Sequence, residues 1–300
     1  MAVRKNYAKL QKKVIQNKRG NLQTVYVKHA EQKKERKNKI GVLELRAELE
    51  KLGVSVMIDT DNGIHTPKGR KEAEKIYKKL DVINYIKDHL NVMNKYVKGG
   101  NNYDSAFTIS YWKDAEIEIN LAIESRNGYG IKVNRTFDFK EKKVTHESFS
   151  MDDKYQGKGI GKELLSIQFR EYKKAGIKKV ESLANGDIGG YAWAMYGFYA
   201  TNSSLNHLNK KWAWKKIHKL WEYEDLTKED FQLAENVIKK YKKANPTSKT
   251  FPMHLIANLH NKKGVHIGKE LLLGEEWDAE MDLTNRKQMN ILNKYLKNER

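Results

Sequence analysis

The strongest structural signal in the chain is the run Met151-Asp-Asp-Lys-Tyr-Gln-Gly-Lys-Gly-Ile-Gly-Lys-Glu-Leu-Leu165. It joins the end of a predicted strand to an amphipathic helix through a short glycine-rich loop. Gly157, Gly159 and Gly161 let backbone N–H groups approach an anion without obstruction from a Cβ atom, and these donors lie at a helix N-terminus. Lys158 and Lys162 add positive charge, so the segment suits a diphosphate group.

Spacing excludes two common phosphate-binding loops. A Walker A loop needs Gly-x4-Gly-Lys-Ser/Thr, but Gln156 stands at the first glycine position and Glu163 replaces the hydroxyl residue that binds magnesium. A dinucleotide loop needs Gly-x-Gly-x-x-Gly in a parallel βαβ unit, but this loop has Gly-x-Gly-x-Gly after strands predicted to be antiparallel. The loop therefore belongs to neither class.

The strands before the loop are predicted from apolar residues that alternate with period two. Asn127-Gly128 is a hairpin signal between two of them. The predicted strands are Phe107 to Tyr111, Ala115 to Ile123, Ile131 to Phe139 and Lys143 to Met151, followed beyond the loop by Ile177 to Leu183. These patterns predict a mixed α/β fold with a mostly antiparallel central sheet flanked by helices.

Helical periodicity predicts the remaining elements, including helical N- and C-terminal extensions. The helices are predicted at Arg4 to Lys18, Val42 to Leu52, from Thr66-Pro67 through Ile86, from Gly161 to Ala175, after the capping box Thr227-x-x-Asp230, and at Thr284 to Leu296. A strand-like run covers Leu22 to Val27. We divide the chain into a basic arm (1–40), a helical region (41–100), the loop-bearing domain (101–200) and a mostly helical region (201–300).

The motif Gln156-x-x-Gly159-x-Gly161 resembles motif A of the GNAT superfamily of acyl-CoA N-acyltransferases, where this loop holds the pyrophosphate of coenzyme A. The resemblance covers roughly residues 105–200, about a third of the chain. In the family, antiparallel strands lead to a central strand, the loop and its helix, a strand that splays from the first, and a helix ending near Gly-Phe. This chain offers the same order and ends it with Gly197-Phe198.

The resemblance implies acetyl-CoA as the cofactor, and it implies that Phe149 to Met151 pair with the amides of pantetheine through backbone groups. The cofactor residues implied are Phe149, Ser150, Met151, Gln156, Gly157, Lys158, Gly159, Ile160, Gly161, Lys162 and Asn185. The implied activity is transfer of an acetyl group to an amine, on an acceptor that is a protein, a nucleic acid or a small molecule.

The catalytic residues depart from the family pattern. The family often places a tyrosine, as general acid, four residues before the glycine of Gly-Phe, but this chain has Trp193 there. Tyr196 is the first candidate for the acid and Tyr191 the second; the alternative is that all three aromatic residues pack in the core. The candidates for the base are His146 and Glu147, which point to opposite faces of one strand, so only one of them can reach the site. We favour Glu147 as the base; the alternative is that its carboxylate only forms an ion pair.

The net charge of +20 is concentrated at the start of the chain. Residues 1–40 hold 13 Lys or Arg against 2 Asp or Glu, which is +11, whereas residues 101–200 carry 15 against 14, which is +1. Such an arm attracts polyanions, so it is a candidate for binding DNA or RNA; the alternative is a solvated helix that aids solubility.

Composition limits the remaining classes of function. The chain has no cysteine, so disulfides, thiolate zinc sites and a cysteine nucleophile are excluded. No apolar run approaches the length of a membrane span, and we expect neither a membrane partner nor a bound metal, because His254, His260 and His266 lack acidic neighbours at ligand spacing. The expected location is the cytoplasm of a bacterial host.

A second resemblance concerns the segments after the loop domain. Gly189 to Phe198, His266 to Trp277, and Asp282-Leu283 look like parts of phage head-morphogenesis and minor-head proteins. This resemblance implies a phage-encoded chain, with a virion location and a virion or host protein as partner. It supports a second hypothesis, a catalytically inactive GNAT-like structural protein associated with the virion or with nucleic acid.

Overall fold

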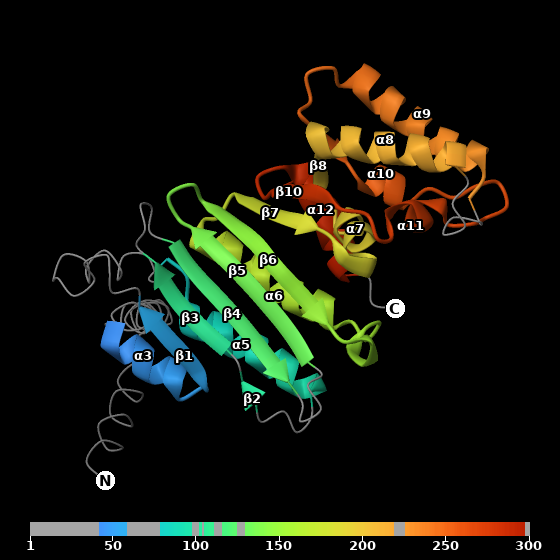
Figure 1. Ribbon diagram of the computed structural model, residues 1–300. Coiled ribbons are helices and arrows are strands. Elements are labelled where there is room, and N and C mark those ends of the chain that lie inside the picture. The colour runs from blue at the N-terminus through green and yellow to red at the C-terminus, as the bar shows by residue number, and fades with distance from the viewer. Residues whose placement is uncertain are drawn as a thin grey trace, which may run out of the picture. The chain divides into compact units, whose positions relative to one another are not determined.

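A computed structural model of the protein (Figure 1) describes residues 42–58, 79–97, 102–103, 105–110, 116–124, 130–218 and 226–297. The chain divides into two compact units, residues 1–48 and 49–300. Helix α3 (Val42–Glu50) contains all that is described of the first unit. The second unit has the predicted fold class, because a mostly antiparallel sheet carries helices on its faces.

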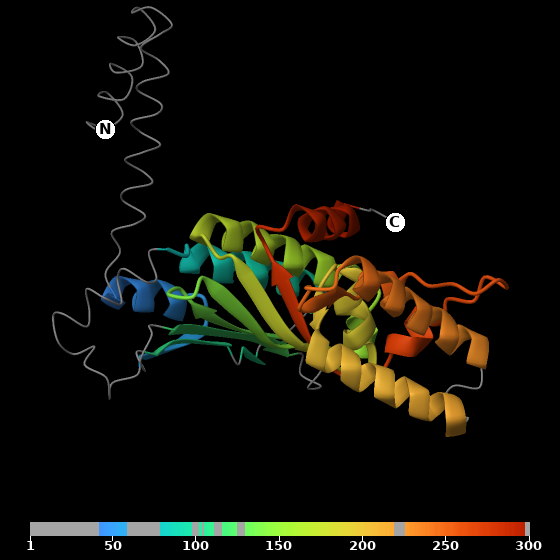
Figure 2. The ribbon, with the colours of Figure 1, turned by 90° about the horizontal axis from the view of Figure 1, so that it is seen from above.

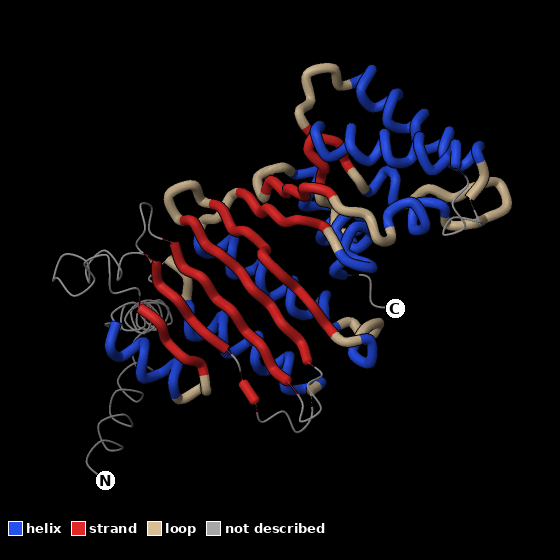
Figure 3. The backbone as a smooth tube through the Cα atoms, in the orientation of Figure 1, coloured by secondary structure: helices blue, strands red, loops and turns tan. Residues whose placement is uncertain are grey.

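The second unit is built on one sheet (Figure 3), in which neighbouring strands are antiparallel except at two places. In order across the sheet, the strands are β1 (Val54–Ile58), β3 (Ser105–Ser110), β4 (Glu116–Glu124), β5 (Gly130–Asp138), β6 (Lys143–Met151), β7 (Lys179–Ala184), β10 (Trp277–Asp282), β8 (Tyr199–Thr201) and β9 (Thr250–Pro252), and β2 (Asn102–Tyr103) pairs with β4. The parallel pairs are β1 with β3 and β6 with β7.

The strands predicted from period two are confirmed within the described residues. In β5, Ile131, Val133 and Phe137 are buried, whereas Lys132 between them is exposed. Successive side chains of a strand point to opposite faces of a sheet, so this alternation places one apolar face against the helices. The Asn127-Gly128 turn lies outside the described residues.

Helices cover both faces of the sheet, with α5, α6 and α12 on one side and α8 on the other (Figure 2). Helix α9 packs against α8, and α10 contacts both α7 and α11. The helical bounds are α5 (Val82–Tyr96), α6 (Ile160–Ala175), α7 (Gly186–Met195), α8 (Asn202–His218), α9 (Lys228–Ala244), α10 (His254–Ala257), α11 (Ile267–Leu272) and α12 (Arg286–Lys297), with a 3₁₀ turn at Asp153–Tyr155.

Two predicted helix ends are confirmed by their caps. Helix α6 ends at Gly176, which has a φ of 75° and closes the last turn by hydrogen bonds to Lys173 O and Tyr172 O. Helix α9 begins with the predicted capping box, in which the side chains of Thr227 and Asp230 each accept a hydrogen bond from the other's backbone N–H.

The sheet extends beyond the predicted loop domain at both ends. Strand β1 lies in the region predicted to be helical, 41–100, and its run Val54 to Ile58 pairs in parallel with β3. Strands β8 to β10 extend the sheet from the predicted C-terminal region, so one sheet crosses the boundaries at 100 and 200. Helix α5 begins at Val82 with Asp81 as its N-cap. Of the helix predicted from Thr66 through Ile86, residues 66–78 lie outside the described part, residues 79–81 form a turn, and the helix is present from Val82 onward.

The predicted elements of the basic arm, residues 1–40, also lie outside the described residues. Among the helices that are described, none combines the length and apolar character that crossing a membrane requires. No group of three or more histidine, aspartate or glutamate side chains in the described ranges is arranged to hold a metal ion.

Candidate active site

The candidate site begins where the two central parallel strands part. Strands β6 and β7 pair only from Lys143 to His146 on β6, opposite Lys179 to Ser182 on β7. Beyond His146, β6 continues to Met151 while remaining paired with β5 on its other side. Among the described strands, none lies beside the last five residues of β6 on the edge that faces β7, and this fork offers backbone groups to an extended ligand.

A bulge in β6 lies at the point where the fork opens. Asn134 of β5 pairs with Ser148, but the next residue, Arg135, pairs with His146, so Glu147 is the extra residue. A bulge leaves one residue out of the ladder and bends the strand. The side chain of Glu147 is exposed and that of His146 is buried. The two neighbours therefore point to opposite faces of the sheet, as predicted for adjacent residues of a strand.

Arg135 holds this bulge from inside the core. Its side chain is only 1% exposed. Nη1 donates to Asn134 O and to Ser148 O, both at 2.7 Å, and Nε donates to Gln168 Oε1 at 3.1 Å. The guanidinium thus satisfies carbonyl groups on both sides of the bulge and ties them to helix α6.

A chain of buried polar groups continues from Arg135 under the fork. Tyr172 OH lies 2.9 Å from His146 Nε2, and Gln168 Nε2 lies 3.1 Å from His89 Nε2. Burial lowers the pKa of His89 to about 3, and burial together with the charge of Arg135 lowers the pKa of His146 well below its usual value. Both imidazoles are therefore neutral at pH 7, and they act as packed, hydrogen-bonded core groups.

The glycine-rich loop places unpaired N–H groups at the start of α6. Within the described part of the chain, the backbone N–H groups of residues 157–161 donate no hydrogen bond, because the first bonds of the helix come from Lys162 and Glu163 to Gly159 O. Gly157 and Gly159 have φ values of 71° and 81°, and a Cβ atom on either would meet open space. Five consecutive unpaired donors therefore lie at the positive end of a helix, with open space beside Gly157 and Gly159.

Gln156 anchors this loop at its first residue. Its Nε2 donates to Met151 O at 3.1 Å and to Asp153 Oδ1 at 2.9 Å. The side chain thus joins the end of β6 to the loop, and both of these hydrogen bonds use its amide nitrogen. This contact explains why glutamine fits the start of the motif on structural grounds alone.

Glu163, in the first turn of α6, is held by side chains of α5. Glu163 accepts hydrogen bonds from Tyr96 OH at 2.6 Å and from Lys95 Nζ at 2.9 Å, which also links α5 to α6. Burial acts to raise the pKa of Glu163, but these hydrogen bonds outweigh it and lower the pKa. The paired Glu163 leaves Lys158 and Lys162 as the charges that an anion on the loop would meet.

The structure brings Phe149, Gly161 and Tyr196 together. A Cβ atom on Gly161 would lie 3.4 Å from Tyr196 OH and 3.6 Å from Phe149 Cε1, so the hydroxyl and the Phe149 ring both lie beside the first turn of α6. The Tyr196 hydroxyl makes no hydrogen bond to the described residues. Burial, and to a lesser extent Tyr295, raise the pKa of Tyr196, so the hydroxyl keeps its proton at neutral pH.

The other two aromatic candidates lie elsewhere. Trp193 is 7% exposed and packs with its ring centroid 4.9 Å from that of Phe198 and 5.3 Å from that of His146. Tyr191 packs edge-on against His266, with 5.6 Å between centroids. Trp193 is thus a core residue, which agrees for this residue with the alternative that the aromatic side chains pack in the core. Tyr191 faces the α10–α11 segment.

The remaining predicted residues line the fork or its rim. Ser150 is exposed, and Met151 is half-buried where β6 ends. Asn185 caps α7 at the end of β7 and is exposed, and Ile160 is buried under the first turn of α6. The predicted cofactor residues therefore belong to β6, the loop, the first turn of α6 or the end of β7, and their roles stay predictions.

One residue that the sequence analysis did not consider lies over the loop. Tyr295 of α12 packs edge-on against Tyr196 with 4.8 Å between centroids, and Lys162 Nζ lies 4.5 Å from the centre of its ring. Helix α12 thereby covers the side of the site where α6 and α7 meet. Nothing in the local pattern of residues 284–296 connects this tyrosine to a loop more than a hundred residues earlier.

Comparison with known proteins adds no relative. No family model matches the chain, and no match is found among curated proteins or solved structures. The interpretation of the site therefore depends on its geometry and on the sequence motif.

Proposed function

We propose that the protein is an acetyl-CoA-dependent N-acetyltransferase of the GNAT type. The observation that carries the proposal is the fork between β6 and β7, with five unpaired N–H groups of residues 157–161 at its mouth. The loop suits the pyrophosphate, because its unpaired donors lie at the positive end of α6 and a Cβ atom on Gly157 or Gly159 would meet open space. The free edge of β6 suits the amides of pantetheine.

The residues around the bulge supply the chemistry in this proposal. Acetyl-CoA contributes the acetyl group as a thioester, and transfer to an amine forms an amide and releases the thiol. Glu147 lies at the bulge with an exposed carboxylate and takes the proton that the attacking amine loses. Tyr196 donates its hydroxyl proton to the departing thiolate. Holding the two reactants together in the fork supplies most of the rate enhancement.

Replacing Tyr196 by phenylalanine is expected to lower kcat by at least about tenfold while leaving acetyl-CoA affinity unchanged, because only a proton donor is removed. The ring contact with Tyr295 is retained, so the melting temperature should change little. Steady-state kinetics of Tyr196→Phe beside Tyr191→Phe measures this. An unchanged kcat in Tyr196→Phe, with a loss in Tyr191→Phe, contradicts the assignment of the acid.

Release of the coenzyme A thiol is the experiment that tests the activity. The chain contains no cysteine, so a thiol reagent such as DTNB reports only the released coenzyme. We expect thiol release that depends on both the protein and an added amine, with polyamines, aminoglycosides and lysine-rich peptides as the panel. Acetyl-CoA binding without thiol release for any amine would favour the second candidate function.

The second candidate is a catalytically inactive structural protein of the virion or of a nucleic-acid complex. The observation that favours it is Trp193, which stands at the family's tyrosine position and is packed in the core against Phe198. Under this proposal the partners are nucleic acid and a virion or host protein. The location is a virion rather than the bacterial cytoplasm that the first proposal implies.

Deleting residues 1–40 is expected to remove most nucleic-acid binding, because this segment carries +11 of the net charge. Binding of a fluorescent duplex by the full chain should weaken steeply with salt and vary little with base sequence. A salt titration of the full and truncated chains measures this, and acetyl-CoA binding by the truncated chain is the control for folding. Equal DNA affinity of the two chains contradicts a role for the arm.

A further inference from the structure

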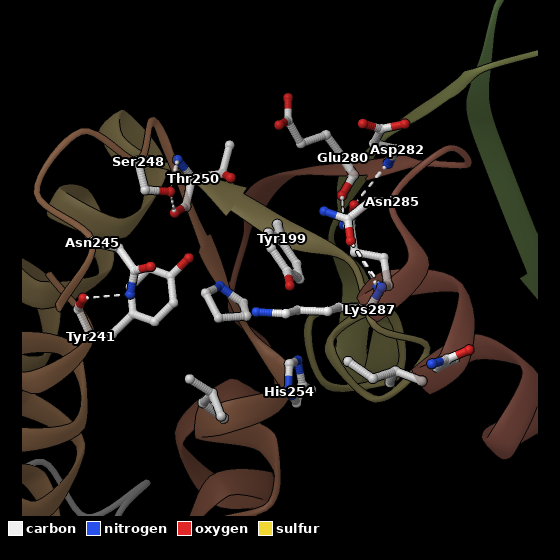
Figure 4. Close-up of a pocket in the computed structure, with 15 residues that line it drawn as sticks. Tyr199, Tyr241, Asn245, Ser248, Thr250, His254, Glu280, Asp282, Asn285 and Lys287 are labelled. Carbon is white, nitrogen blue, oxygen red and sulfur yellow. Dashed lines mark hydrogen bonds between the residues drawn. The ribbon is translucent and has the colours of Figure 1, made fainter.

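A cavity of about 700 Å³ lies beyond the candidate active site, on the side of the sheet where β7 begins (Figure 4). Strands β8, β9 and β10 and helices α9, α10 and α12 contribute to its walls. Its volume falls within the range of about 300–1,000 Å³ that is typical of small-molecule sites. None of the residues that form the fork or the glycine-rich loop lines this cavity.

Three hydrogen-bond donors in the cavity are uncommitted. Tyr199 OH, Tyr241 OH and Lys287 Nζ form no hydrogen bond or ion pair with any residue that the structure describes. Figure 4 shows the side chains of Tyr199, Lys287 and His254 converging on the same space from a strand and two helices. Tyr199 and Tyr241 are half-buried, and Lys287 is exposed. Half-buried polar groups are normally paired, so two unpartnered hydroxyls that line a cavity beside a lysine indicate a place for a ligand.

Other polar groups of the wall are already committed to the protein. Asn245 Nδ2 donates to Tyr241 O at 3.0 Å, and Ser248 OH donates to Thr250 O at 2.7 Å. Gln288 accepts from Asp282 N at 3.0 Å. These bonds fix the wall, so the cavity is a formed site. Its unpartnered groups among the described residues include the two hydroxyls, the ammonium and His254 Nδ1.

The next feature is the protonation state of the titratable groups that line the cavity. Burial, and then the neighbouring Tyr241, raise the pKa of Tyr199, so this hydroxyl stays protonated. Burial lowers the pKa of His254, so its ring is neutral at pH 7. Lys287 is therefore the one positively charged side chain among the described residues that line the cavity.

Two carboxylates, those of Glu280 and Asp282, also line the cavity, and Figure 4 shows them on the same side of the view as Lys287. Glu280 pairs with Lys179 at 3.0 Å, and Asp282 Oδ1 accepts from Thr284 Oγ1 at 2.6 Å and from Thr284 N at 2.8 Å. A ligand with several negative charges would meet these carboxylates as well as the ammonium and be repelled by them. The charge distribution therefore favours one anionic group, located at Lys287.

We propose that this cavity is a binding site for a small molecule with a single anionic group, a carboxylate or a phosphate monoester. Lys287 pairs with the anion, and the hydroxyls of Tyr199 and Tyr241 donate hydrogen bonds to it. The site is separate from the fork and from the loop that suits a diphosphate. It does not depend on the acetyltransferase proposal.

Saturation-transfer NMR on the full chain tests the proposal, with benzoate and phenyl phosphate as the two anionic probes and benzyl alcohol as the neutral analogue. We expect both anions to bind better than the alcohol, and the stronger of the two identifies the ligand class. Lys287→Met should weaken anion binding about tenfold, and Tyr199→Phe should weaken it less. Arg286→Met is the matched control, because Arg286 is an exposed cation on the same turn that does not line the cavity.

Three results would overturn the proposal. The first is benzyl alcohol binding as well as benzoate, because the site would then not recognise charge. The second is equal anion affinity in Lys287→Met, Tyr199→Phe and the wild type, with melting temperatures confirming that all are folded. The third is loss of anion binding in Gly159→Glu with retention in Lys287→Met, which would place the anion at the glycine-rich loop.

Discussion

The Gly159→Glu variant is expected to lose the thermal stabilisation that acetyl-CoA gives to the wild-type protein. A ligand at a hundred times its Kd stabilises the folded state by about 2.7 kcal/mol, which corresponds to a rise in Tm of several degrees for a chain of this size. At Gly159 a Cβ atom points into open space in front of the loop donors, so a glutamate there fills the volume with negative charge. Differential scanning calorimetry with and without acetyl-CoA measures the Tm of the wild-type protein and of Gly159→Glu.

Backbone strain needs its own control, because Gly159 has a φ of 81° that any other residue adopts at a cost of about 1–2 kcal/mol. Gly176 at the other end of α6 has a φ of 75° and equally open surroundings. Gly176→Gln therefore reproduces the strain, and its neutral side chain avoids an unfavourable charge at the helix C-terminus. If Gly159→Glu keeps the acetyl-CoA effect, the loop is not the pyrophosphate site. If Gly176→Gln loses the effect as well, backbone strain in α6 rather than the filled loop accounts for the loss.

Gly190→Ala is expected to be the most damaging small substitution in the helix that follows β7. A Cβ atom at Gly190 would lie 2.5 Å from both Leu272 O and Glu275 O, and these are backbone atoms that cannot turn aside. The carbonyl group of Gly190 also accepts a hydrogen bond from Trp277 Nε1 at 3.2 Å. Pushing α7 away from this segment should cost about 3 kcal/mol, which urea unfolding measures.

The neighbouring glycine provides the matched control for that substitution. Gly189 lies in the same helix, and the nearest atom to a Cβ there, Ala184 C, is 4.0 Å away. Alanine favours a helix over glycine by about 1 kcal/mol, so Gly189→Ala should be neutral or stabilising. Equal effects of Gly189→Ala and Gly190→Ala would show that α7 is not held against the α11–β10 segment in this way.

The central strands and their helix could be predicted because their signals are local. In β5 the apolar residues alternate, and α6 starts after glycine and ends at Gly176. Strand β1 was not predicted, because its five residues follow a helix and its partner β3 lies about fifty residues further along the chain. Strands β8 and β9 have three residues each, too few for an alternating pattern to be distinguished.

The site was predictable only where the backbone itself carries the chemistry. The loop of residues 157–161 was found from its glycines, whereas the bulge at Glu147 follows from contacts between separate strands. One available signal was Arg135, which occupies an inward position in the alternation of Ile131, Val133 and Phe137. A charged residue on the apolar face of a strand indicates a buried polar partner, which here is the bulge carbonyl of Ser148.

Isothermal titration calorimetry of acetyl-CoA into the wild-type protein tests the central claim most directly. The fork beside β6 and the unpaired donors of residues 157–161 predict a saturable, exothermic titration with about one acetyl-CoA per chain. Coenzyme A should compete for the same site, because it carries the same pyrophosphate. A titration that gives no binding heat at millimolar acetyl-CoA, on protein that calorimetry shows to be folded, would contradict the account.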